Sequence, residues 1–260
     1  MKAAVYSGTR NLYPHMVTAA KSLIANSGVE KIYFLIEDDK FPDELPPLIE
    51  TVNVSGQKWF PADGPNMKSQ FTYMALVRCC YPELFPGLDR ILQLDVDTIV
   101  VDNIDELWDL DMSRKWIAMA EEKFTTNHPY GIQYFNCGVA MMNLDQQRKD
   151  DAMQQMVQLL NREALPYVEQ DAWNKLGYPR KILEIPVRFN ETMVTGFTEK
   201  PAIVHYAGFK NCWGNPRTPR MEYYAKYRDM TWKGAFACRG TEAPVTAPKK
   251  PRARKKPAES

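Results

Sequence analysis

The chain has 260 residues, of which 45% are hydrophobic, so it is long enough to bury the core of one large α/β domain. The formal net charge is +1, but residues 241–260 carry six lysines and arginines against two glutamates, a charge of +4, which leaves −3 for residues 1–240. A mildly acidic folded part argues against a general nucleic-acid-binding domain, and no run approaches the roughly 20 apolar residues of a membrane span.

The first elements in chain order are a strand, a helix and a second strand. Residues 2–6 are apolar, and the small polar residues 7–11 end this strand. Apolar residues then recur at helical spacing up to a stop at Gly28, and residues 31–36 form the next apolar run. Ligands of open α/β sheets bind at the carboxyl ends of strands in such a βαβ unit. The loop Ser7–Tyr13 is therefore a candidate ligand loop.

Strands and helices alternate along the rest of the chain, which indicates a mostly parallel sheet flanked by helices. Residues 71–77 carry a helical pattern that leads into the apolar strand 90–94. A long helix is expected from about Leu144 to Leu160, with an apolar stripe that favours core packing. The other expected elements are strands at about 52–54, 116–120, 135–143, 182–185 and 203–206 and a short helix that opens at 169–171.

Two aspartates follow the strand 90–94 directly. Asp95 and Asp97 are separated by Val96, and in extended backbone residues i and i+2 face the same side about 6 to 7 Å apart. Two carboxylates that close repel each other unless a positive charge lies between them, and a divalent cation supplies that charge. The pair therefore indicates half of a metal site. Taken alone, Asp-x-Asp is also typical of a turn with a helix cap.

A third metal ligand is expected from a histidine, of which the chain has three. His205 ends the apolar run 202–204, so it leaves a strand as Asp95 does. His15 opens a helix and His128 lies in a polar loop, which makes His205 the candidate. A single histidine after a strand is also typical of a hydrogen-bonded structural residue.

Gly208 and Lys210 follow His205 closely. Glycine allows close backbone approach to a ligand, and lysine is a point charge suited to phosphate. Two carboxylates and one imidazole with open positions suit Mn²⁺, because Mg²⁺ prefers oxygen ligands to imidazole, and Mg²⁺ is the alternative. A metal and a lysine together indicate a diphosphate ligand.

In its motifs the chain resembles the glycogenin-like family 8 of retaining glycosyltransferases, which have the GT-A fold, a Rossmann-like nucleotide-binding sheet. The matching segments occur in the family's order and together span Ala3 to Trp213. They are Ala4–Tyr13, Leu94–Thr98, Phe135–Val139, Glu169–Asn174 and His205–Lys210 with Trp213.

The resemblance implies a role for each group of residues. Asp95, Asp97 and His205 would hold Mn²⁺ on the diphosphate of a UDP-sugar. The remaining implied contacts are uridine with Ser7, Thr9, Asn11, Tyr13 and the backbone of Val96, the sugar with Arg78, Asn136, Glu169 and Gln170, and the phosphates with Gly208 and Lys210.

The chain departs from the family pattern in three places. Arg10 precedes Asn11 where the family has Asp-Asn or Asn-Asp in the first loop. Glu169 precedes Gln170 where the family has Asp-Gln, so the carboxylate is one methylene longer. Lys210 stands one residue earlier than the family lysine, and a proline of the pattern is replaced.

The implied reaction is transfer of a hexose from a UDP-sugar to an acceptor hydroxyl, and two routes remain open. Gln170 is an uncharged amide and a poor nucleophile, which favours a role in positioning the sugar while the acceptor attacks on the face that UDP leaves. Glu169 is a carboxylate that can act as the nucleophile of a double displacement. The acceptor class also stays open among a saccharide, a lipid-linked glycan and a protein, including a tyrosine of this chain.

Two other functions fit part of the sequence. A nucleotidyltransferase also pairs carboxylates with a metal on a similar sheet, but it is expected to have a glycine-rich basic loop after the first strand, which residues 7–11 match poorly. A non-catalytic binding protein that acts through the basic tail would not need Asp95, Asp97 and His205 together. Nothing in the sequence indicates an oligomeric state.

The end of the chain differs in composition from the rest. Residues 241–260 hold four prolines among the basic residues, so we expect a domain at 1–240 followed by a disordered basic tail at 241–260 that suits an anionic partner. Five cysteines without a Cys-x-x-Cys pair favour reduced thiols and a cytoplasmic location. Met1 leads directly into an apolar strand without the hydrophobic region of a secretion signal, so no such signal is expected.

Overall fold

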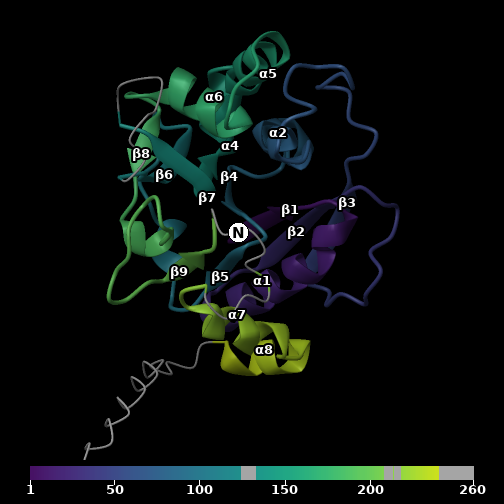
Figure 1. Ribbon diagram of the computed structural model, residues 1–260, viewed down its shortest axis with the longest axis vertical. Helices are drawn as coiled ribbons and strands as arrows, with labels where there is room; N and C mark the ends of the chain where they lie inside the picture. Colours follow the sequence, from purple (N-terminus) through teal and green to yellow (C-terminus); the bar gives the residue numbers. More distant parts are fainter. Residues whose placement is uncertain (124–132, 208–212, 214–217, 240–260) are drawn as a thin grey trace, which may run out of the picture.

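The computed structural model describes residues 1–123, 133–207, 213 and 218–239, which form a central sheet covered by helices on both faces (Figure 1). The sheet has seven strands in the order β3-β2-β1-β4-β7-β6-β8. Only β7 runs antiparallel to its described neighbours β4 and β6, which confirms the expected mostly parallel α/β architecture. The bounds are β1 (Ala3–Ser7), β2 (Lys31–Ile36), β3 (Ile49–Asn53), β4 (Arg90–Leu94), β6 (Ile117–Glu121), β7 (Phe135–Asn143) and β8 (Ile182–Glu184).

The βαβ unit predicted at the start of the chain is present. Helix α1 (Tyr13–Asn26) connects the parallel strands β1 and β2. The apolar residues that recur at helical spacing in it are fully buried: Met16, Ala19, Ala20, Leu23 and Ile24. Strand β1 also pairs in parallel with β4, with Tyr6 opposite Leu94. The carboxyl ends of β1 and β4 therefore meet at one edge, which brings the loop after Ser7 close to Asp95.

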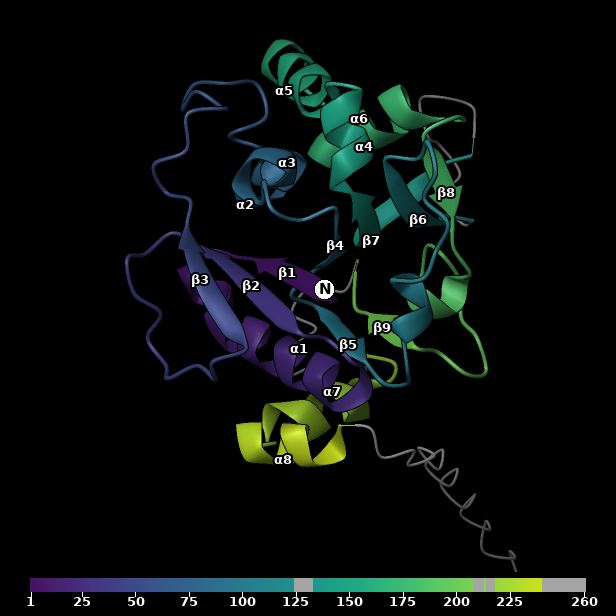
Figure 2. The ribbon, with the colours of Figure 1, turned by 180° about the vertical axis from the view of Figure 1, so that it is seen from behind.

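Helices cover the two faces of the sheet as separate groups (Figures 1 and 2). The first group packs in a hydrophobic cluster with Trp173 and Met156. In the second group Leu23 and Ala235 lie in one cluster, and Tyr224 packs with Ala25 in another. The first group is α2 (Met74–Val77), α3 (Tyr81–Leu84), α4 (Leu144–Lys149), α5 (Ala152–Arg162) and α6 (Val168–Gly177); the second is α1, α7 (Met221–Arg228) and α8 (Trp232–Cys238).

The single long helix expected from Leu144 to Leu160 is wrong, because the structure has two helices there. Helix α4 ends at Lys149 and α5 begins at Ala152. Asp151 lies between them in the left-handed region, with φ of 50°. Aspartate is among the few non-glycine residues that adopt this conformation readily, so the break costs little.

A second, two-stranded sheet lies beside the first and consists of β5 (Thr98–Val100) and β9 (Ile203–His205). The two strands are antiparallel, with Thr98 opposite His205. The sequence predicted β9 but not β5 as a separate strand.

The described residues contain no helix with both the length and the hydropathy that crossing a bilayer requires. Among the residues that the structure describes, Cys79, Cys80 and Cys137 are buried free thiols. The expected tail, residues 241–260, lies outside the described residues, and α8 is the last described helix before it.

Candidate active site

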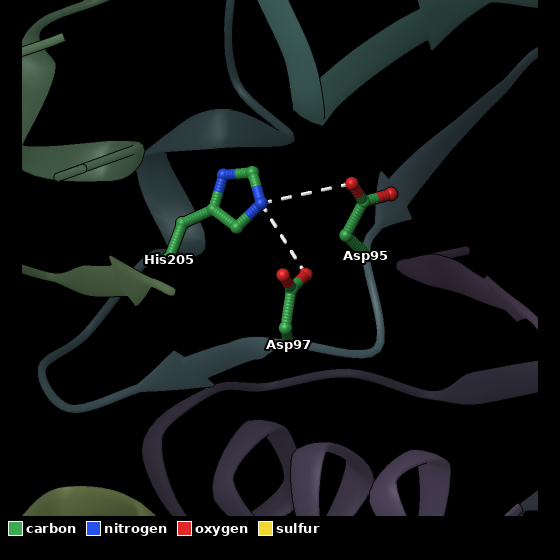
Figure 3. Close-up of side chains that lie close together, drawn as sticks. All are labelled: Asp95, Asp97 and His205. Atoms are coloured by element: carbon green, nitrogen blue, oxygen red, sulfur yellow. Dashed lines mark ion pairs between the residues drawn. The ribbon is translucent and has the colours of Figure 1, made fainter. Parts of the chain in front are cut away.

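Asp95, Asp97 and His205 converge at the edge of the sheet where β4 ends (Figure 3). Each offers one ligand atom, and these atoms lie within 4.8 Å of one another. His205 Nε2 is 3.3 Å from Asp97 Oδ1 and 3.6 Å from Asp95 Oδ2. Two carboxylate oxygens and one imidazole nitrogen converging on one point are a donor set for a divalent cation with open positions.

A turn brings the two aspartates together, where the sequence suggested extended backbone. The Thr98 N–H and Thr98 Oγ1 both donate to Asp95 O, at 3.1 and 2.6 Å. Asp95 N–H donates to Gly138 O, and Asp97 O accepts from Tyr206 N–H. The backbone of each aspartate is thus tied to a neighbouring segment, which preorganises the two carboxylates before any ligand binds.

His205 reaches the aspartates because β9 pairs with β5 directly after the turn. Its backbone N–H donates to Glu191 O, and its ring lies against Gly138 in β7. A Cβ built on Gly138 would lie 2.8 Å from both Nδ1 and Nε2 and closer still to Cε1. The ring therefore occupies the space that any other residue at position 138 would fill.

Burial and close approach set the titration of these three groups. Burial lowers the pKa of His205, but the neighbouring carboxylate of Asp97 outweighs it and the pKa is raised. Burial raises the pKa of Asp97, but His205 more than offsets this and the pKa is lowered. The pKa of Asp95 is raised by burial, which Arg78 opposes and Asp97 reinforces. Without a cation, His205 and Asp97 thus hold each other in the ionised form, and a bound cation would take the place of the ring proton.

Arg78 bridges the aspartates to a third buried carboxylate. Its guanidinium lies 2.7 Å from Asp95 Oδ1 and 3.0 Å from Glu169 Oε1. Its Nε donates to Ser7 Oγ at 3.4 Å. Burial acts to lower the pKa of Arg78, but Asp95 and Glu169 raise it, so the side chain stays charged. Arg78 therefore links the end of β1, the aspartate turn and the start of α6.

Glu169 is buried, with 2% of the residue exposed. Burial raises its pKa to about 7, although Arg78 opposes this. Within the described residues Oε2 has no hydrogen-bond partner, while Cys137 Sγ lies 3.6 Å from Oε1. A buried carboxyl oxygen without a partner beside a cationic group is a contact point for a polar ligand.

The next residue, Gln170, is held in one orientation. Its Oε1 accepts from the Cys137 N–H at 3.1 Å, and its Nε2 donates to Glu122 Oε1 at 3.1 Å and to Tyr134 Oη at 3.2 Å. Val168, two residues before Gln170, has φ of 39°, which is strained for a β-branched side chain. Strain of this kind is found where the surroundings fix the backbone for function.

Asn136 faces the histidine side of the site. Its Oδ1 accepts from Gly138 N–H and from Asn190 Nδ2, and its Nδ2 donates to Glu122 Oε1. Asn190 Oδ1 in turn lies 2.8 Å from His205 Nδ1. The structure thus joins Asn136, predicted to face the sugar, to the predicted metal ligand.

Glu122 and Asn190 did not stand out in the sequence. Glu122 follows the strand 117–121 as Asp95 follows 90–94, so the same strand-end pattern could have identified it. Asn190 follows a short 3₁₀ turn, Val187–Phe189, and no spacing pattern distinguishes it.

The predicted uridine loop is held largely by contacts within itself and with the end of β2. Thr9 Oγ1 donates to Asn11 Oδ1 at 2.7 Å. The Tyr13 hydroxyl donates to Asp38 and accepts from the Glu37 N–H, and burial raises its pKa to about 12. Tyr13 thus anchors the loop rather than presenting a free hydroxyl.

The structure describes some, but not all, of the other residues predicted to contact the sugar nucleotide. Val96 is buried in the core cluster around α1, so its side chain points away from the two carboxylates. Gly208 and Lys210 lie outside the described residues. Trp213 stacks on His15 of α1, with ring centroids 3.7 Å apart.

Comparison of the sequence with protein families gives one match over most of the chain. The model of glycosyl transferase family 8 matches residues 4–215. A putative glycosyltransferase of Haemophilus influenzae is 24% identical over 72% of this chain and 62% of its own length. General stress protein A of Bacillus subtilis is 25% identical over 63% of this chain and 67% of its own length. The chain thus spans about two thirds or less of the length of these relatives.

Solved structures share the fold at low identity. The galactosyltransferase LgtC in complex with donor and acceptor sugar analogues superposes with a TM-score of 0.68 and 20% identity, over 90% of this chain and 99% of LgtC. The glycosyltransferase GlyE of Streptococcus pneumoniae gives a TM-score of 0.69 and 22% identity, over 91% of this chain and 62% of GlyE.

Proposed function

Since the chain belongs to glycosyl transferase family 8 and has the GT-A fold, we propose that it moves a hexose from a UDP-sugar to an acceptor hydroxyl with retention at the anomeric carbon. The observation that carries the proposal is the convergence of Asp95, Asp97 and His205 beside the Arg78–Glu169 ion pair. A metal site next to a buried, cation-bound carboxylate fits a ligand that combines a diphosphate with a polar sugar.

Asp95, Asp97 and His205 would hold the cation, for which we propose Mn²⁺. Their donor set of two oxygens and one nitrogen fits this ion, and Mg²⁺ is the alternative. A bound divalent cation supplies charge stabilisation to the diphosphate as it departs. Because that charge is stabilised, the chain needs no acid to protonate the leaving group.

Arg78 and Glu169 would orient the sugar. The guanidinium keeps Oε1 of Glu169 in place, so that the unpartnered Oε2 is available to accept from a sugar hydroxyl. Gln170 would present its amide to the anomeric side, in the orientation that Cys137 N–H and Glu122 impose. Both residues are buried, which excludes water from competing with the acceptor.

Two reaction routes give retention of configuration at the anomeric carbon. In the first, the bond from the anomeric carbon to the diphosphate breaks, UDP leaves with the electron pair, and the acceptor oxygen bonds to the same face while its proton passes to the departing phosphate oxygen. In the second, Glu169 bonds to the anomeric carbon as the bond to the diphosphate breaks and UDP leaves with the electron pair. The acceptor oxygen then bonds to the anomeric carbon, the Glu169 carboxylate leaves with the electron pair of its bond, and the acceptor proton passes to a UDP phosphate oxygen. The ion pair with Arg78 makes Oε1 a weaker nucleophile, which favours the first route.

The remaining donor contacts follow from the family. Ser7, Thr9, Asn11, Tyr13 and the Val96 backbone would contact uridine, Asn136 the sugar, and Gly208 and Lys210 the phosphates. The acceptor would be a saccharide, a lipid-linked glycan or a protein, and the basic tail 241–260 would attract an anionic partner.

The proposal is tested by incubating the protein with Mn²⁺ and a panel of UDP-sugars without acceptor. Mass spectrometry follows released UDP and the mass of the protein itself. We expect UDP release from at least one sugar nucleotide, dependent on Mn²⁺ and abolished by chelator. Absence of UDP binding in calorimetry with Mn²⁺ present would contradict the proposal.

A further inference from the structure

Glu122, Asn136, Asn190 and His205 form a series of four hydrogen-bonded side chains. We propose that Asn190 fixes the tautomer of His205 directly and that Glu122 acts on it through Asn136 and Asn190, both as positioning residues. The inference rests on the proposed function for the role of His205, but the hydrogen bonds of the four side chains do not depend on it. Three of the four groups are buried: Asn136, Asn190 and His205. Buried polar groups of this kind must find partners within the protein.

Backbone N–H groups, which can only donate, determine which atoms donate and which accept along this series of side chains. The Gly138 backbone N–H can only donate, so the Asn136 atom 3.0 Å from it is Oδ1. The other Asn136 atom is then Nδ2, which donates to Glu122 Oε1 at 2.8 Å. The same Oε1 accepts from Gln170 Nε2, whose orientation the Cys137 N–H fixes independently.

The orientation of the Asn190 amide follows from that of Asn136. One atom of its amide lies 2.9 Å from Asn136 Oδ1 and 3.3 Å from Asn136 O. Both of these are acceptors, so this atom is Nδ2. The remaining atom, Oδ1, is therefore an acceptor, and it lies 2.8 Å from His205 Nδ1.

The orientation of the Asn190 amide determines which nitrogen of His205 is protonated. Acceptors face both ring nitrogens, but Asn190 Oδ1 lies 2.8 Å from Nδ1, whereas the nearest carboxylate oxygen lies 3.3 Å from Nε2. The neutral ring is therefore expected to keep its proton on Nδ1, which leaves the lone pair on Nε2. Nε2 is the atom that lies 3.3 and 3.6 Å from the two aspartates. The relay of Glu122, Asn136 and Asn190 thus selects the tautomer that can bind a cation between Asp95 and Asp97.

The side chain of Asn190 has this role beyond stabilising its own turn. Its backbone N–H donates to Val187 O and its carbonyl accepts from Thr195 Oγ1, so the turn has contacts that do not involve the amide. Replacement of the amide is therefore expected to change the tautomer of His205 more than the fold.

The primary test is the ring spectrum of ¹⁵N-labelled, metal-free protein at alkaline pH, where the imidazole is neutral. The chain has three histidines, so the His205 signals are assigned by loss in His205→Gln. We expect the Nδ1–H tautomer in the wild type and in Asn190→Asp, whose carboxylate still accepts from Nδ1. In Asn190→Leu we expect a shift toward Nε2–H and Mn²⁺ affinity lowered about 10- to 100-fold.

Asn66→Leu is the matched control. Asn66 is also buried, but its amide binds the backbone at Leu160, Glu163 and Leu165, away from His205. We expect this variant to lose thermal stability and keep the His205 spectrum. An Nε2–H ring in the wild type, or an unchanged tautomer and Mn²⁺ affinity in Asn190→Leu, would overturn the proposal.

The contribution of Glu122 is tested by a double-mutant cycle on Mn²⁺ affinity. Glu122→Gln alone is expected to weaken binding, but to add little in the Asn190→Leu background because the relay is already broken. Additive effects would show that Glu122 does not act through Asn190. If the tautomers behave as expected while UDP-sugars fail to bind, the relay stands and the proposed function falls, so the two failures are distinguishable.

Discussion

Gly138 lies against the imidazole of His205 so closely that a Cβ on Gly138 would overlap the ring. Gly138 O also accepts from the Asp95 N–H at 2.7 Å. One residue of β7 thus touches two of the three candidate metal ligands. The glycine of the Phe135–Val139 segment is explained by this approach, since no L side chain fits beside the ring.

Gly138→Ala is expected to displace His205 and to lower Mn²⁺ affinity at least about 10-fold, because the ring must move away from Asp97. Isothermal titration with Mn²⁺ measures the loss, and circular dichroism checks the fold. Gly87→Ala is the control, since nothing lies within 4 Å of a Cβ built there. Equal Mn²⁺ affinity in the two variants would place the cation elsewhere.

Asp97→Asn is expected to abolish Mn²⁺-dependent UDP release. The amide keeps the shape of the carboxylate but removes the charge that balances the cation, so affinity is expected to fall by more than about 100-fold. The measurement is UDP release across a Mn²⁺ titration, with and without chelator. Full release by Asp97→Asn in the presence of chelator would refute the metal assignment.

His205→Ala is expected to weaken Mn²⁺ and UDP binding together. The two ligands are linked through the site, so loss of the cation lowers UDP affinity by the same coupling factor. UDP is titrated calorimetrically with and without Mn²⁺, and the effect should vanish without Mn²⁺. The control is His128→Ala, at a position outside the described residues that the sequence places in a polar loop. Equal effects of the two substitutions would mean that the third ligand is misassigned.

Glu169 is expected to make stability depend on pH. Its pKa rises from 4.5 to about 7 on folding because of burial, so the folded protein holds the proton more tightly than the unfolded chain. This contribution is fully present below pH 4.5 and is lost as pH rises toward 7, by roughly 3 kcal/mol. Urea unfolding at pH 5 and pH 8 measures it.

The control for that experiment is Glu169→Gln, which removes this one carboxyl group and keeps all other titratable side chains. The wild type should lose roughly 2.5 kcal/mol more than this variant between the two pH values, because part of the contribution is already lost at pH 5. Parallel losses in the two proteins would show that Glu169 titrates in its ordinary range.

Removal of residues 241–260 is expected to leave melting temperature, Mn²⁺ binding and UDP release unchanged. The segment has no apolar residue larger than valine, so it offers little area to bury. The truncation keeps Arg239, whose guanidinium donates to Val29 O. Binding to a polyanion at low salt should weaken in the truncated protein. A drop in melting temperature of several degrees would mean that the boundary at 240 is wrong.

Much of the fold could be predicted because its signals are local. Strand β7 and strand β2 were located at the bounds the structure has, since long apolar runs bounded by polar residues leave little choice. The Asp95, Asp97 and His205 cluster was predicted because Asp95 follows an apolar run and His205 ends one, a pattern that needs no details of packing. The structure brings them together through the pairing of β5 with β9 in the second sheet, since β9 does not pair with β4.

Other features depend on contacts that a sequence does not display. The break at Asp151 escapes periodicity because Met153 and Met156 continue an apolar stripe after it. Asn190 acts through one amide whose partners lie 54 and 15 residues away in sequence. The turn at Asp95–Asp97 replaced an expected extended segment because the apolar residues after Asp97 form a separate strand, β5, that pairs with β9.

The guanidinium of Arg78 forms ion pairs both with Asp95 in the aspartate turn and with the buried carboxylate of Glu169, which we propose faces the sugar. A library that varies Arg78 alone would score nearly every substitution as inactive, because each change leaves both Asp95 and Glu169 without their cation. Variants with a new donor preference are therefore expected only where Arg78 and Glu169 change together. Substitutions at this site are best screened in pairs of positions, because the effects of neighbouring substitutions are coupled through the side chain of Arg78.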